Sequence, residues 1–300
     1  MVQKKPALAL LTTLFFVMVM SLLLTQSMKT LNKGVSHLEK TNFMLQSLII
    51  QDDILKFLKS SPYIKQINDQ VTLDMFIDTL SSVPLPPIDG LAVSFSAKSA
   101  ANGLNINIIK DHKELQSLLI HYLATKYNLN DPQFLIDLIL DSTKGEQDYY
   151  KTNIFYDYPN FYRDHIESNQ HLKDLVGYYV AQRDDHTILK VPFEDIFTYQ
   201  DNNSSYKMDM NYMDEEVWSI LVPEKDMYNA IYDIGGVSKD DDLQSIGLTK
   251  ERISFIKKFA TYNNLKINIE VLLTKDDEEA IMSFDYDLNS SKGENFEFYI

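Results

Sequence analysis

The side chains that could carry out chemistry are few and widely spaced. The six histidines show no H-E-x-x-H or other metal-ligand spacing, and there is no cysteine for thiol catalysis, cysteine metal sites or disulfides. The sequence also lacks the G-x-S-x-G, P-loop and G-x-G-x-x-G motifs of nucleophilic and nucleotide chemistry. We therefore expect no enzymatic activity. The histidines are His37, His112, His121, His165, His171 and His186.

Clustered carboxylates are the remaining candidates for ligand chemistry. Asp240, Asp241 and Asp242 follow the pair Gly235-Gly236 in a loop-like stretch, and clustered oxygen ligands on a loop suit calcium. We favour a solvated run that caps the next helix, with calcium as the alternative. Calcium is thus the one cofactor that the sequence leaves open.

Two further acidic groups are interpreted structurally. The run 276–279 lies between two predicted strands and is expected to form a hairpin turn. Asp285, Asp287 and Asn289 imitate the start of an EF-hand loop, but Ser290 stands in place of its glycine. Their spacing of two is typical of the solvent-facing side of a strand.

An aromatic patch between Tyr149 and Tyr162 is a candidate surface. Its favoured interpretation is that it packs helices onto the rest of the domain; the alternative is an interface anchor or a carbohydrate platform. Its members are Tyr149, Tyr150, Phe155, Tyr156, Tyr158, Phe161 and Tyr162.

Charge and length limit the possible partners. The 300 residues carry a formal net charge of −15, with an isoelectric point near 4.8, which argues against nucleic acid and anionic lipid surfaces. The apolar content of 45% is sufficient for a packed core. We expect a globular body in an aqueous compartment.

These residues must be positioned by the elements around them, beginning with an apolar segment. The chain is uncharged from Ala7 to Met28, and a helix rising ~1.5 Å per residue over this length crosses the ~30 Å hydrocarbon core. Lys4 and Lys5 precede this segment and predict a cytoplasmic amino terminus, with the bulk of the chain outside. A single-pass membrane anchor is therefore expected.

The apolar stripe continues beyond the anchor at helical spacing, which predicts one long helix from Pro6 to Lys59 that ends at Ser60-Ser61-Pro62. After another helix at 73–80, alternation and the turn pair Asn102-Gly103 predict a hairpin or a closely spaced strand pair over 90–109.

The middle of the chain is predicted to be helical, and Asn130-Asp131-Pro132 supplies a cap and an early proline for one of its helices. A helix at 250–262 and three strand-like segments close the chain. The fold class is therefore α+β: a long N-terminal transmembrane and amphipathic helix, and a small antiparallel sheet interrupted by an all-helical subdomain.

The first of these elements resembles the amino terminus of K-type minor pseudopilins of type II secretion systems, within the type IV pilin-like superfamily. The segment ALALL at 7–11 is similar to their processing site, with Ala7 standing where the family has glycine. The resemblance implies cleavage between Ala7 and Leu8 and places Thr12 at the fifth mature position. Most pilins have glutamate there, and the K-type subunits do not.

Later segments resemble the family in the same order. Residues 92–109 are similar to its strand, turn and strand, although the acidic residues of that turn are missing. Residues 130–150 resemble its D-W-x-D-x-D…G-x-E-x-x-Y helix, with Leu138 replacing the tryptophan, and residues 207–221 retain Asn211 of a later motif. The recognisable positions of the helix motif are Asp137, Asp141, Gly145, Glu146, Tyr149 and Tyr150.

The resemblance implies a minor pseudopilin at the tip of a periplasmic pseudopilus, which initiates its assembly and supports protein export. The implied partners are the I- and J-type minor pseudopilins, the major pseudopilin, the inner-membrane assembly platform and the prepilin peptidase. The implied location is the bacterial inner membrane, with the bulk of the chain in the periplasm and a methylated mature amino terminus. Some K-type relatives bind calcium in the inserted domain.

Two alternatives stay open. One is a single-pass, membrane-anchored periplasmic protein that binds a ligand or acts as an accessory factor; the other is a minor pilin of a type IV pilus or DNA-uptake machine. The predicted segments are a leader peptide (1–7), a transmembrane helix (8–28), its periplasmic extension (29–60), the first part of the pilin-like domain (61–109), the helical insertion (110–239) and the second part of the pilin-like domain (240–300).

Overall fold

The structure is a computed structural model that describes residue 20 and residues 39–61, 64–82, 91–145, 149–200, 206–275 and 278–299. The predicted leader peptide, with Ala7 and Leu8, lies outside the described residues, as do Thr12 and, Met20 apart, the whole transmembrane segment 8–28. Among the residues that are described, no helix is both long enough and apolar enough to span a membrane.

The chain divides into two compact units. The first comprises residues 1–100 and 265–300, and the second is the continuous segment 101–264. The second unit is therefore inserted into the first. The elements of the first unit are α2 (Glu39–Ser60), the 3₁₀ helix η1 (Ile64–Gln66), α3 (Gln70–Ser82), β1 (Leu91–Ser99), β6 (Lys266–Lys275), β7 (Glu278–Asp287) and β8 (Lys292–Tyr299).

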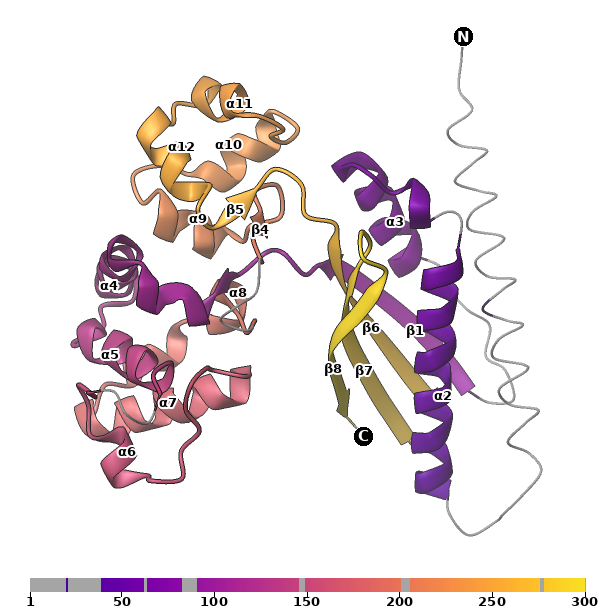
Figure 1. Cartoon of the computed structure of the whole chain (residues 1–300), viewed down its shortest axis with the longest axis horizontal. Coiled ribbons are helices and arrows are strands. Elements are labelled where there is room, and N and C mark those ends of the chain that lie inside the picture. Colours follow the sequence, from indigo (N-terminus) through magenta and orange to yellow (C-terminus); the bar gives the residue numbers. More distant parts are fainter. Residues whose placement is uncertain are drawn as a thin grey trace. The chain divides into compact units, whose positions relative to one another are not determined.

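The four strands of the first unit form one sheet in the order β1-β6-β7-β8, with all neighbours antiparallel (Figure 1). The last three strands follow one another as a meander, and Lys275 pairs with Glu278, so Glu278 and Glu279 belong to β7 and not to the predicted hairpin turn. β1 pairs with β6 along its whole length, although the inserted unit separates the two strands in the sequence. The prediction of an α+β fold with a small antiparallel sheet is confirmed.

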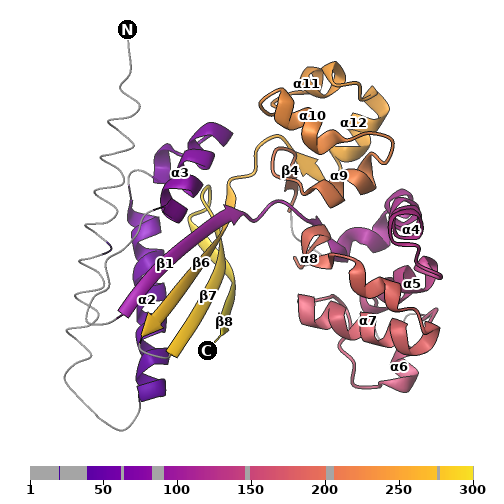
Figure 2. The same cartoon turned by 180° about the vertical axis from the view of Figure 1, so that it is seen from behind.

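Helix α2 lies along the sheet (Figures 1 and 2) and contacts β7. Its residues Ile50, Ile54 and Phe57 are buried at spacings of four and three, which place them on one helical face. On β1, buried Leu91, Val93 and Phe95 alternate with exposed residues, as expected for a strand with one covered face. The helix ends at Ser60, as predicted.

Strand β8 forms an edge of the sheet and is mostly exposed. Its pairing with β7 shifts register between Ser283 and Asp285, and Asn295 adopts the left-handed conformation with φ of 52°. Glu294 of this strand accepts a hydrogen bond from Lys266 on β6 at 3.0 Å. The edge is therefore irregular and charged.

The second unit is mainly helical but is not all-helical, so that prediction was wrong. Two pairs of very short parallel strands join segments that are distant in the sequence. The sequence did not predict them, because two residues per strand are too few to show an alternating pattern. These are β2 (Leu104–Asn105) with β3 (Phe197–Thr198), and β4 (Met208–Asp209) with β5 (Ala260–Thr261).

The helices of this unit surround one hydrophobic core that extends from Leu104 to Ala260. Asp131 caps α5 by accepting a hydrogen bond from the Phe134 N–H at 3.1 Å, and Pro132 opens the helix, as predicted. The helices are η2 (Ile106–Asp111), α4 (Lys113–Tyr127), α5 (Pro132–Ser142), α6 (Ile154–Asp157), α7 (Asn169–Arg183), η3 (His186–Lys190), α8 (Phe193–Ile196), α9 (Glu215–Leu221), α10 (Met227–Asp233), α11 (Asp240–Ser245) and α12 (Lys250–Ile256).

The hairpin predicted over 90–109 was also wrong. β1 pairs with β6, whereas the second half of the segment forms β2 and the 3₁₀ helix η2 in the other unit. The alternation in LNINII arises instead from buried asparagines. The Asn107 amide donates to the carbonyls of Ile166 and Gln200 at 2.9 and 3.0 Å, and its oxygen accepts from the Ile166 N–H at 2.7 Å.

Asp209 holds the two ends of the inserted unit. Its N–H donates to the carbonyl of Ala101 at 2.8 Å, and its fully buried carboxylate accepts from the Asn264 N–H at 2.7 Å. The unit therefore begins and ends at 101 and 264, whereas the sequence placed the boundaries at 110 and 239. The difference arises because helices η2, α11 and α12 pack into the core of this unit.

Two glycines of the inserted unit give opposite expectations. A Cβ on Gly103 would lie 2.9 Å from the Thr198 methyl group and 3.2 Å from the Phe197 carbonyl carbon, where β2 and β3 pair. We expect Gly103→Ala to lower the free energy of unfolding by about 1–3 kcal/mol through overpacking. Chemical denaturation of the full chain measures this.

Gly177 provides the matched control. It lies in α7, and a Cβ there meets nothing within 4 Å. Gly177→Ala should raise the free energy of unfolding by about 0.5–1 kcal/mol, because alanine loses less backbone entropy in a helix. The same sign for both substitutions would contradict the close approach at Gly103.

Candidate functional site

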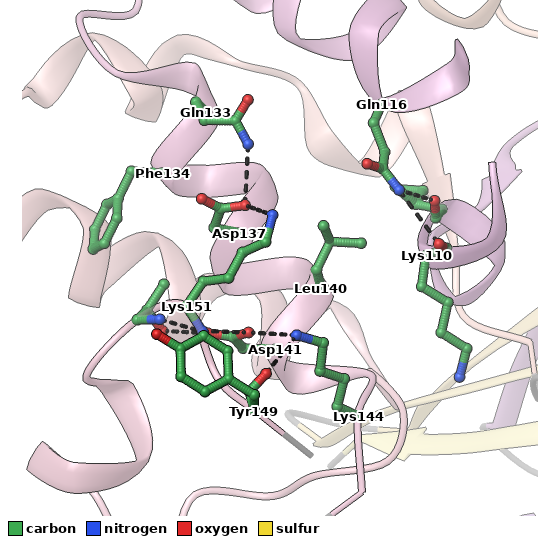
Figure 3. A network of polar contacts seen from close by, with 12 residues as sticks. Lys110, Gln116, Gln133, Phe134, Asp137, Leu140, Asp141, Lys144, Tyr149 and Lys151 are labelled. Carbon is green, nitrogen blue, oxygen red and sulfur yellow. Dashed lines mark hydrogen bonds and ion pairs between the residues drawn. The ribbon is translucent and has the colours of Figure 1, made fainter. Parts of the chain in front are cut away.

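The carboxylate of Asp141 organises the loop that follows α5 (Figure 3). Asp141 is completely buried, and it accepts hydrogen bonds from the N–H groups of Lys151 and Thr152 at 2.9 and 2.7 Å and from the Thr152 hydroxyl at 2.8 Å. The Lys144 ammonium lies 3.2 Å from its other oxygen. A buried charge needs such partners, so this network ties the loop to the helix.

Asp137 lies one turn before Asp141 on α5 and faces more solvent (Figure 3). Its Oδ1 accepts from the Lys151 ammonium at 2.6 Å and from the Gln133 amide at 3.0 Å. Asp137 and Asp141 thus both accept hydrogen bonds from the segment that begins at Lys151. That segment leads directly into α6.

A polar cavity of roughly 390 Å³ opens beside Asp137. Its walls come from the first turns of α5, the 151–153 segment and the last turns of α7. Arg183 on α7 donates to Asp131 at 2.7 Å, and its guanidinium carbon lies 3.6 Å from the centre of the Phe134 ring. The ring and the carboxylate together fix the guanidinium at the cavity wall.

Tyr178 closes one side of this cavity. Its hydroxyl donates to Asp157 at 2.7 Å, and burial, followed by that hydrogen bond, raises the pKa of Tyr178 above its usual range. Tyr158 packs edge-on against Tyr178 with ring centroids 5.9 Å apart and remains 57% exposed. Tyr178 thus lines the cavity and Tyr158 packs against it from outside the lining; we call these two residues the tyrosine rim.

The structure divides the predicted aromatic patch. Phe155 is buried, and Tyr150 and Phe161 pack against the core, as the favoured interpretation expected. Four tyrosines of the patch are exposed instead. They are Tyr149, Tyr156, Tyr158 and Tyr162.

Asp240, Asp241 and Asp242 occupy the first turn of α11, where their carboxylates diverge. Asp242 accepts from the Ser238 N–H and hydroxyl at 2.8 and 2.9 Å, and so caps its own helix. Asp240 accepts from Tyr262 and Lys257, whose hydrogen bonds hold its pKa below the usual range.

This arrangement does not fit a calcium site, because Asp240 and Asp242 are each bound to separate protein partners. Across the described ranges, no group of three or more histidine, aspartate or glutamate side chains is placed to hold a metal ion. The other carboxylates considered from the sequence have protein partners as well: Asp285 bonds Asn268 and Asn295, and Asp287 holds the turn after β7. Asp242 caps its own helix, as the favoured interpretation expected, and calcium remains an untested alternative.

The histidines within the described ranges take part in no cluster placed to hold a metal ion. His171 is buried against Phe161 and Tyr162, and this burial lowers its pKa. His112 packs edge-on against Phe259. His37 lies outside the described residues.

Comparison with solved structures gives an informative likeness. No protein-family model matches the sequence, and no curated protein matches it. In structure, the chain is similar to a chain of the GspK-GspI-GspJ complex of the type 2 secretion system of enterotoxigenic Escherichia coli. The TM-score is 0.60 at 12% sequence identity, over 87% of this chain and 98% of that chain.

The chain has the fold of a K-type minor pseudopilin. Coverage of nearly the whole matched chain means that the pseudopilin fold accounts for both units, including the insertion. Within this fold the recognisable motif residues Asp141 and Asn211 are structural. The Asn211 amide donates to the carbonyls of Val237 and Tyr262, each at 3.0 Å.

The sequence singled out both carboxylates of the cavity, Asp131 as a helix cap and Asp137 as a motif residue, but did not reveal the cavity itself. Gln133, Gln182 and Arg183 belong to no motif, and the walls come from segments separated along the chain. The available signal was Asp137, whose helical spacing from Asp141 places both acids on neighbouring turns.

The two acids of α5 should differ in their effect on stability. Asp141→Asn replaces an oxygen that accepts buried N–H bonds by a second donor, so we expect a loss of about 1–3 kcal/mol in the free energy of unfolding. Asp137→Asn removes a partly exposed ion pair and should cost less than about 1 kcal/mol. Urea denaturation of the two variants compares them. Equal losses would show that the Asp141 network does not hold the loop.

Proposed function

We propose that this protein is a minor pseudopilin at the tip of a periplasmic pseudopilus, where it starts assembly and supports protein export by a type II secretion system. The observation that carries the proposal is the fold likeness, which spans almost the entire matched chain and includes the large insertion. An insertion of this size between paired strands β1 and β6 is not required by the small sheet itself.

The proposed partners are the I- and J-type minor pseudopilins. The similar chain was solved in a complex with two other proteins, which supports partners of the same kind here. Helix α2 exposes Leu48 and Ile49, at 41% and 37%, beside its buried stripe. Exposed apolar side chains on a helix already packed on its own sheet suit a contact with another helix.

Complex formation tests this proposal. The chain from Lys29 onward, mixed with the I- and J-type subunits of the same bacterium, should form one ternary species in size-exclusion chromatography with light scattering. Ile49→Asp should weaken that complex at least tenfold, because a charge would have to be buried at the contact.

The control for this experiment is Asp52→Asn on the same helix. It removes an exposed charge that pairs only with Lys56 within α2, so the complex should persist. Failure of the unmodified chain to bind either subunit would contradict the pseudopilin proposal and would favour an anchored ligand-binding or accessory protein.

We further propose that residues 8–28 anchor the protein in the bacterial inner membrane and that prepilin peptidase cleaves between Ala7 and Leu8. The support is the uncharged segment behind Lys4 and Lys5 together with the processing-site resemblance. Thr12 at the fifth mature position leaves no carboxylate in the anchor to pair with a neighbouring amine, as suits a terminal subunit.

Mass spectrometry of the protein from its native membrane decides the processing step. The expected mature chain begins at Leu8 and carries a methyl group on its amino nitrogen. Ala7→Glu, which places a charge at the processing site, should leave the precursor intact, whereas Ala9→Ser should be processed normally. A chain that retains Met1 or Val2 would identify the segment as a plain anchor.

A further inference from the structure

The polar cavity of the inserted unit has the chemistry of a ligand site, which the proposed function does not use. Its roughly 390 Å³ approaches the size of small-molecule pockets, and its lining is predominantly polar. The cavity is distinct from another hollow of this unit, an apolar groove lined by residues such as Leu172, Val176 and Phe193. The question is which ligand would match these groups.

Charge excludes strongly ionic ligands. The cavity contains two acids and two bases, and each acid is paired with a base: Asp131 with Arg183 at 2.7 Å, and Asp137 with Lys151 at 2.6 Å. The formal charge of the lining is therefore zero, so an anion or a cation would compete with an existing ion pair. A neutral ligand does not have to break one.

Hydrogen-bonding groups remain available for such a ligand. Asp137 binds its protein partners through Oδ1, and Arg183 donates to Asp131 through Nε alone. Among the described residues, the side-chain amides of Asn153 and Gln182 make no hydrogen bond. The cavity thus offers donors and acceptors side by side, which is what hydroxyl groups require because each both donates and accepts.

Aromatic rings complete the match. Tyr178 forms part of the wall, and Tyr158 stands against it with a ring that is more than half exposed. Tyr156, two residues earlier in α6, is 86% exposed. Such rings present flat apolar faces beside polar groups, and the C–H face of a sugar ring packs on them.

We propose that this cavity and its tyrosine rim bind a neutral oligosaccharide, with Asp137, Gln182 and Arg183 hydrogen-bonding its hydroxyl groups and Tyr158 stacking on a sugar ring. The inference is independent of assembly through α2, so either proposal stands if the other fails. Two sources share this chemistry: the N-acetylated β-1,4 glycans of cell walls, and unsubstituted glucans.

Calorimetric titration of the purified full chain with defined trisaccharides tests the proposal. Chitotriose represents the N-acetylated source, while cellotriose and maltotriose represent plain glucans; trigalacturonate and chitosan trimer supply negative and positive counterparts. We expect at least one neutral trisaccharide to bind with millimolar or tighter affinity and at least tenfold more tightly than either charged one. The neutral sugar that binds identifies the source.

Variants locate the binding to the cavity. Gln182→Ala and Asp137→Asn should each weaken binding about five- to tenfold, the effect of losing one hydrogen bond to a neutral group. Tyr158→Ala should weaken it at least as much. Gln182 is exposed and makes no hydrogen bond in the fold, so its truncation tests binding without affecting folding.

Tyr232→Ala is the matched control, because Tyr232 on α10 is 80% exposed and lies outside the cavity lining. It should leave the affinity unchanged. The proposal is overturned if no neutral trisaccharide binds at 10 mM, if a charged one binds more tightly, or if Gln182→Ala and Tyr232→Ala affect binding equally. Binding of the I- or J-type subunit that Tyr158→Ala abolishes and chitotriose does not displace would assign the rim to a protein partner instead.

Discussion

The pairing of β1 with β6 is the constraint on which both units depend. The two strands are neighbours in the sheet, yet the entire segment 101–264 lies between them in the sequence. The pairing requires the two ends of the insertion to lie close together. Asp209 of the insertion holds them there, because it forms hydrogen bonds with both Ala101 and Asn264. Because loop-closure entropy grows only slowly with length, a folded insertion whose ends are held together acts on the sheet almost as a short connection would. The sheet can therefore keep its register whatever the insertion presents at its surface.

Other buried polar side chains stabilise the insertion as Asp209 does, by hydrogen bonds to backbone groups. Asn107, Asn211 and Asp141 each satisfy backbone groups of segments distant in the chain, in a unit that has no disulfide and only two-residue strands. Leaving any of these buried side chains without a hydrogen-bond partner would cost free energy. Each one therefore determines which loops lie next to each other in the folded unit. This arrangement leaves the outer ends of α5 and α7 free to carry Gln133, Gln182 and Arg183, and an open cavity is compatible with a well-ordered core.

Sequence patterns correctly predicted those elements that depend on neighbouring residues alone. The end of α2 at Ser60, the Asp131 cap of α5 and the three closing strands follow from proline, capping chemistry and alternation, and the structure has them. The prediction of a hairpin over 90–109 was wrong because Asn102-Gly103 indicates a turn but not which strand pairs with β1. In the structure β1 pairs with β6, which is distant in the sequence. The cavity could not be predicted for the same reason: Asp137, Asn153 and Gln182 meet only in the folded unit. Resemblance identified the fold, since the order of many weak motifs carries information that no single spacing does.

Strand β8 has a consequence for how the protein behaves among its neighbours. An edge strand with unpaired backbone groups invites another chain to add to the sheet, which is a route to aggregation. Here the register shift opposite Ser283, the left-handed Asn295 and the charges of Lys292, Glu294 and Glu297 make a poor template for such addition. The protein thus carries, in the sequence of this strand, its own protection against forming fibrils through this edge.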